Sequence, residues 1–121
     1  MILGQDALHR RVGSQEIGRD QFVALAQAGE DSGDAAQFTI QVLPPGTVLH
    51  PGISAGPASI LLFAPRPAPG LVHVPALSGT GHFIDDPGAV DGFIQAFTRL
   101  QSMALSPAES AELIRHYAKA A

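Results

Sequence analysis

The stretch Phe-Thr-Ile-Gln-Val-Leu at residues 38–43 alternates between apolar and polar side chains from Phe38 to Val42. This two-residue period predicts a β-strand with one apolar face, because successive side chains of a strand point to opposite sides. The sequence Pro-Pro-Gly at residues 44–46 ends the strand. We therefore expect residues 38–43 to form the strand around which the rest of the fold is organised.

Other segments that predict strands lie mostly in the middle of the chain. Residues 59–63, Ser-Ile-Leu-Leu-Phe, form an apolar run that is typical of a central strand covered on both faces. Residues 71–74 predict a third strand, which lies at a sheet edge or ends at Pro75, because proline has no N–H to donate. A short strand is expected around residues 82–84, and residues 2–3 begin the chain as if inside a strand.

Helices are predicted on either side of these strands. Ser14 predicts the N-cap of a first helix, and Gly29 predicts its end. Asp86 predicts a second N-cap, with Pro87 in the first helical position and apolar residues at helical spacing after it. The sequence Ser-Pro-Ala-Glu at residues 106–109 is a capping box, which predicts the start of the last helix.

The order of these elements indicates an α+β fold. We expect a small mixed or antiparallel sheet of about four to five strands packed by helices, two of them C-terminal. The chain has 121 residues, of which 45% are hydrophobic, and this length suits one hydrophobic core. We therefore expect a single domain over residues 1–121.

Charge and composition exclude several classes of protein. The net charge of −4, from 7 Lys and Arg against 11 Asp and Glu, argues against nucleic-acid binding by this chain alone, because such proteins carry a basic face. The absence of cysteine excludes disulfides and thiolate chemistry. The chain begins without the pattern of a signal peptide and has no apolar stretch long enough to span a bilayer. We expect a soluble, cytoplasmic protein that binds neither nucleic acid nor membrane.

Several short strings occur in an order that resembles one family. The two most specific are Ile-Gln-Val-Leu-Pro at residues 40–44 and Ala-Leu-Ser-Pro-Ala-Glu-Ser at residues 104–110. The others lie at residues 7–13, 50–52, 56–57, 77–79 and 85–87. Together they resemble the domain of unknown function that follows the XRE-type helix-turn-helix in actinobacterial regulators of the WhiJ type.

The chain departs from that family at three places. It begins at the first strand, without the family's DNA-binding domain. Gly4-Gln5 stands where the family tends to have an acidic pair, and His73-Val74-Pro75 stands where it tends to have Tyr-Val-Glu. Either the chain is a fragment of a longer regulator, or it is a free-standing descendant with a changed role, and the loss of the acidic positions favours the second. The resemblance carries over no catalytic residues.

Three histidines are candidates for proton transfer near neutral pH. His50 lies in a loop rich in proline and glycine, His73 on a predicted strand, and His82 beside a glycine turn. We predict His73, His82 and Asp85 as catalytic residues, with Asp85 as a general base, whereas the N-cap role already accounts for Asp86. The alternative is that these histidines are unrelated side chains on the surface or in local hydrogen bonds.

Metal and cofactor motifs are absent from the sequence. The spacings H-x-x-x-H and H-E-x-x-H do not occur, and the glycine turn at residues 79–81 lacks the lysine and helix start of a phosphate-binding loop. We therefore predict no metal and no other cofactor.

The stretch at residues 44–70 contains seven of the ten prolines. Long loops of this kind in compact domains are often binding loops, although a rigid connection is the alternative. With apolar side chains nearby, we predict a pocket for an apolar small molecule, lined by Leu49, His50, Ile53, Leu62 and Phe63.

Two functions therefore remain open. The first is a sensor-like domain, derived from a transcriptional regulator, that binds a small molecule or a small partner protein. The alternative is a small cofactor-independent biosynthetic enzyme of secondary metabolism, a cyclase or isomerase that acts on an apolar polyketide-like or terpenoid-like substrate by acid–base catalysis. A third, weaker reading is a homodimerisation module with the amphipathic helices at its interface.

Overall fold

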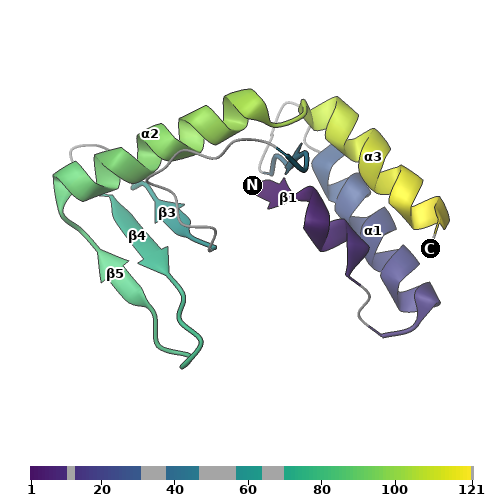
Figure 1. Cartoon of the computed structure of the whole chain (residues 1–121), viewed down its shortest axis with the longest axis horizontal. Coiled ribbons are helices and arrows are strands. Elements are labelled where there is room, and N and C mark those ends of the chain that lie inside the picture. The colour runs from purple at the N-terminus through teal and green to yellow at the C-terminus, as the bar shows by residue number, and fades with distance from the viewer. Residues whose placement is uncertain (11–12, 31–37, 47–56, 64–69, 121) are drawn as a thin grey trace. The chain divides into compact units, whose positions relative to one another are not determined.

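The computed structural model of the chain describes residues 1–10, 13–30, 38–46, 57–63 and 70–120 (Figure 1). The expected α+β class is confirmed, with helices at both ends of the described chain and two of them C-terminal. The elements are, in order, β1 (Ile2–Gly4), the 3-10 helix η1 (Gln5–His9), α1 (Gln15–Glu30), β2 (Gln41–Leu43), β3 (Ser59–Leu61), β4 (Leu71–Val74), β5 (His82–Ile84), α2 (Pro87–Met103) and α3 (Pro107–Ala120).

The predicted N-caps are confirmed, because each of these side chains accepts a hydrogen bond from the backbone N–H three residues later. The pairs are Ser14 with Ile17 at 3.2 Å, Asp86 with Ala89 at 3.0 Å, and Ser106 with Glu109 at 3.1 Å. The Glu109 carboxylate in turn accepts from the Ser106 N–H at 3.3 Å, which completes the capping box. At its other end α1 continues one residue past Gly29.

The five described strands form two sheets rather than one. β1 and β2 pair in parallel, and β3, β4 and β5 form an antiparallel sheet in that order. The predicted strand at 38–43 is shortened to Gln41–Leu43, because β1 offers only three residues to pair with. The expected buried face extends back only to Ile40, since Ile40 and Val42 are buried whereas Phe38 is 44% exposed.

The expectation that residues 59–63 are covered on both faces is wrong for the described structure. β3 lies at an edge of its sheet, and the side chains of Leu61, Leu62 and Phe63 are each about half exposed. An apolar run alone does not distinguish a central strand from an edge strand with one open face. β4 is the central strand and ends directly before Pro75, as its sequence predicts.

The chain divides into two compact units. One comprises residues 1–48 and 100–121, and the other comprises residues 49–99. The single domain expected over residues 1–121 stays a prediction beside this division. Each unit is described by itself below.

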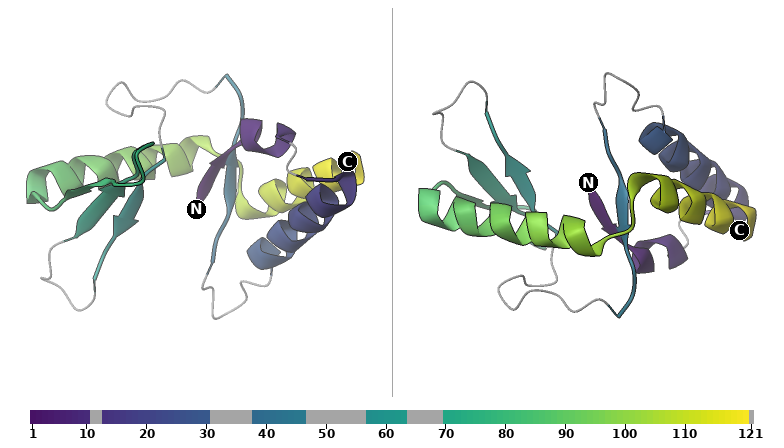
Figure 2. Two further views of the ribbon diagram at one scale, coloured as in Figure 1. Left: turned by 90° about the horizontal axis from the view of Figure 1, so that it is seen from below. Right: turned by 90° about the horizontal axis from the view of Figure 1, so that it is seen from above.

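The core of the first unit lies between α1, α3 and the β1–β2 pair. Figure 2 shows α1 and α3 side by side, with the two strands next to them. The side chains at the centre of this core are almost fully buried, and they are Leu8, Ala26, Ile40, Val42 and Ile114.

The free edge of β2 is satisfied by the α2–α3 connection. The Val42 carbonyl accepts from the Leu105 N–H at 2.9 Å, and the Val42 N–H donates to the Ser110 hydroxyl at 2.8 Å. The Gln41 side-chain amide donates to the Leu105 carbonyl at 3.1 Å. The segments at 40–44 and 104–110, which carry the family resemblance most specifically, therefore meet each other in space.

The second unit is the three-stranded sheet with the first part of α2 beside it. Its buried apolar side chains among the described residues are Val72, at the centre of β4, and Val90, on α2. Gly70 leaves room for this packing, because a Cβ atom there would lie 3.1 Å from a Val90 methyl carbon and 3.0 Å from a Leu62 methyl carbon.

Candidate functional site

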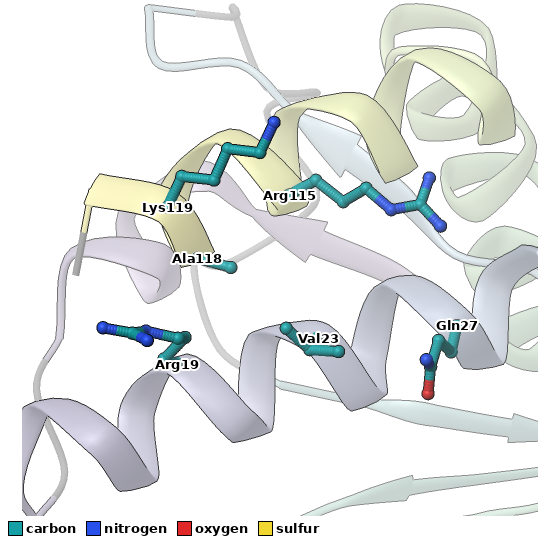
Figure 3. Close-up of a pocket in the computed structure, with 6 residues that line it drawn as sticks. All are labelled: Arg19, Val23, Gln27, Arg115, Ala118 and Lys119. Atoms are coloured by element: carbon teal, nitrogen blue, oxygen red, sulfur yellow. The ribbon is translucent and has the colours of Figure 1, made fainter.

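A groove lies between α1 and α3 in the described part of the first unit. It has a volume of about 440 Å³ and is lined by Arg19, Val23 and Gln27 from α1 and by Arg115, Ala118 and Lys119 from α3 (Figure 3). Helical geometry produces both walls, because residues three or four apart share one face of a helix. Cavities of a few hundred Å³ are the size that small-molecule ligands occupy.

The groove combines an apolar floor with positive charge. Ala118 is buried at the floor, and Val23 beside it is 40% exposed. The rim carries three of the chain's 7 Lys and Arg residues, although the net charge of the whole chain is −4. The groove is thus a local positive region on an acidic protein.

The three cations of the groove differ in their ion pairing. Both guanidinium nitrogens at the end of Arg115 donate to the two carboxylate oxygens of Glu30, the last residue of α1. Within the described part of the chain, Arg19 and Lys119 have no salt bridge. Among the described residues, therefore, no acidic side chain is paired with these two positive charges at the groove.

The predicted catalytic histidines are on adjacent strands but on opposite faces of the sheet. In the β4–β5 register His73 pairs with Phe83, whereas His82 pairs with Val74. Paired residues share a face and neighbours along a strand do not, so His73 and His82 point to opposite sides. The described structure does not bring these two side chains into one site, and their catalytic roles stay a prediction.

His73 has a packing role on its face of the sheet. Its ring lies 4.7 Å from the ring of Phe83, with 33° between the two planes. On the other side of the turn, a Cβ atom on Gly81 would lie only 2.4 Å from the His73 Nε2 atom, so the imidazole rests against the Gly81 backbone. A neighbouring aromatic ring and a glycine contact account for the position of this side chain.

The remaining predicted site residues are exposed or lie outside the described structure. His82 and Asp85 are exposed, and Asp85 directly precedes the N-cap of α2. Leu62 and Phe63 follow β3 with about half of each side chain exposed. Leu49, His50 and Ile53 lie outside the described residues, so the predicted pocket around them stays a prediction. Among the described residues, no three His, Asp or Glu side chains are grouped so that they could hold a metal ion.

Comparison with known protein families places the sequence in one of them. The family described as "Domain of unknown function (DUF5753)" matches residues 1–116. The chain belongs to this family. No curated protein and no solved structure matches this DUF5753 domain.

A hydrogen-bonded cluster in this DUF5753 domain was not foreseen from the sequence. The Tyr117 hydroxyl accepts from the Gln5 side-chain amide at 2.9 Å and lies 3.0 Å from the His9 Nε2 atom. The His9 and Tyr117 rings meet edge to face, with centroids 5.0 Å apart. The cluster attaches η1 to α3, and residues more than 100 positions apart give no local signal that would predict it.

Within the described ranges, no helix of this DUF5753 domain combines the length and the hydropathy that crossing a bilayer requires.

Proposed function

We propose that this DUF5753 domain is a sensor-like binding domain, and that the α1–α3 groove holds an acidic small molecule with an apolar part. The observation that carries the proposal is the pair of cations, Arg19 and Lys119, that stand without salt bridges in the described structure beside the apolar floor. An acid group on the ligand would pair with these cations, and its apolar part would cover Val23 and Ala118.

The groups that line the groove favour binding over acid–base catalysis. Apart from the cations, the lining offers the side-chain amide of Gln27 and two apolar side chains. Among the described residues, the lining contains no His, Asp or Glu, which are the usual acids and bases of enzymes near neutral pH. We therefore favour the sensor-like domain over the cyclase or isomerase alternative, and a small molecule over a small partner protein.

The resemblance to regulators of the WhiJ type supports a sensory role. In this proposal the domain descends from the part of a transcriptional regulator that follows the helix-turn-helix, and it acts in the cytoplasm. The net charge of −4 agrees with a domain that does not bind DNA itself.

The experiment uses a fluorescent amphipathic acid, 8-anilinonaphthalene-1-sulfonate, titrated with the purified chain. We expect Arg19→Gln and Lys119→Gln each to weaken binding about threefold to fivefold, as loss of one exposed charge contact implies. Arg10→Gln is the matched control, because it removes the same charge at an exposed position that does not line the groove.

The outcomes separate clearly. Wild-type affinity in Arg10→Gln together with weaker binding in the two groove variants supports the proposal. Equal affinity in all four proteins, or no binding to the wild type, contradicts it. The uncharged analogue N-phenyl-1-naphthylamine serves as a second control, and its binding should not depend on Arg19.

A further inference from the structure

One wall of the groove carries a cation that is already occupied by an acid of the same chain. Arg115 lines the groove, and both of its terminal nitrogens donate to the Glu30 carboxylate. This arrangement of two parallel hydrogen bonds is the geometry in which a guanidinium group binds oxyacids such as carboxylates and phosphates. Glu30 thus occupies the position on Arg115 that a ligand's acid group would take.

The Arg115–Glu30 ion pair is exposed, so another acid group can displace the Glu30 carboxylate. The Arg115 and Glu30 side chains are 45% and 38% exposed, so water competes for both partners. Pairs as exposed as this contribute only about 0 to 1 kcal/mol to stability. Glu30 also lies at the C-terminal end of α1, where the helix dipole disfavours a negative charge.

We propose that Glu30 is an internal competitor that sets the affinity and the ligand class of the groove. This inference rests on the proposed binding function. An incoming ligand displaces the Glu30 carboxylate from Arg115, and its own acid group takes the two hydrogen bonds. The ligand is therefore an oxyacid, such as a carboxylate, phosphate or sulfonate, because such a group offers two oxygen atoms to the two N–H groups in place of the Glu30 carboxylate.

The exchange makes the three cations of the groove available to a ligand at different stages. Arg19 and Lys119 have no salt bridge in the described structure and attract an anion first. Arg115 becomes available only to a group that outcompetes Glu30. An anion that binds too weakly to displace Glu30 therefore pairs only with Arg19 and Lys119.

The variants Glu30→Gln and Glu30→Gln/Arg115→Gln test the exchange with the same fluorescent sulfonate. We expect Glu30→Gln to tighten binding about threefold to fivefold, because Arg115 is then free for the ligand. We expect the double variant Glu30→Gln/Arg115→Gln to return to within about twofold of the wild type, because the gain depends on Arg115. Glu112→Gln is the matched control, since it removes an exposed acid from α3 that does not line the groove.

The possible outcomes distinguish a failure of this inference from a failure of the proposed function. A gain in Glu30→Gln that the double variant loses, with Glu112→Gln unchanged, supports the exchange. The inference alone is overturned if the wild type binds through Arg19 but Glu30→Gln gives no gain. It is also overturned if the gain survives in the double variant or is matched by Glu112→Gln, because net charge then explains it. Absence of binding in every variant overturns the inference together with the proposed function.

Discussion

The hydroxyl of Ser110 accepts a hydrogen bond from the backbone N–H of Val42 at 2.8 Å, and both residues are completely buried. The same hydroxyl lies 3.4 Å from the Leu105 carbonyl, to which it donates. The Ser110 hydroxyl on α3 therefore accepts the hydrogen bond that a neighbouring strand would accept from the free edge of β2. This contact joins the two segments that are most specific for the family.

Replacing Ser110 by alanine should lower the free energy of unfolding of the first unit. The Val42 N–H would stay buried without a partner, and such a loss costs about 1–3 kcal/mol. Urea unfolding followed by the fluorescence of Tyr117, the chain's single tyrosine, reports on this unit. The exposed Ser78→Ala is the control, and an equal stability of both variants would show that the buried hydroxyl is dispensable.

Asp85 and Asp86 form a natural pair for a comparison of a catalytic and a capping role. Asp86→Ala should destabilise the chain by about 1 kcal/mol, because the Ala89 N–H loses its acceptor at the start of α2. Asp85→Ala should leave stability unchanged, since Asp85 is exposed and caps no helix. Thermal unfolding by circular dichroism measures both, and a reversed order of the two variants would contradict the assignment of the cap.

How much of this architecture is predictable from the sequence depends on the range of the interactions. The caps at Ser14, Asp86 and Ser106 were predicted because each depends on residues three positions apart. The faces of His73 and His82 depend on the register between two strands, and adjacent strands alone do not say which side chains meet. The groove was missed because its walls come from α1 and α3, whose residues lie up to 100 positions apart.

Gly81 should not tolerate a side chain. In Gly81→Ala the new Cβ atom would lie 2.4 Å from the His73 ring and 2.6 Å from the Val74 carbonyl oxygen. Overpacking of this kind costs about 1–3 kcal/mol. Adding His73→Ala should recover only part of the loss, because the contact with the backbone oxygen remains. Gly92→Ala, at an open position in α2, is the control and should be neutral or stabilising in thermal unfolding.

Binding of the fluorescent sulfonate should weaken as salt is added. Salt at 1 M reduces the screening length from about 10 Å at 0.1 M to about 3 Å, which weakens the attraction of exposed cations for the ligand. The uncharged analogue should bind equally well, or better, at high salt, because only its apolar contacts contribute. A sulfonate affinity that is independent of salt would indicate that Arg19 and Lys119 contribute little to binding.

The most direct test of the central claim is a map of the binding site from ¹H–¹⁵N correlation spectra, recorded with and without 8-anilinonaphthalene-1-sulfonate. The proposal predicts the largest changes in backbone amide shifts at Arg19, Val23, Ala118 and Lys119, on the two walls of the groove. Changes confined to the sheet around His73 and Phe83, with α1 and α3 unaffected, would contradict it.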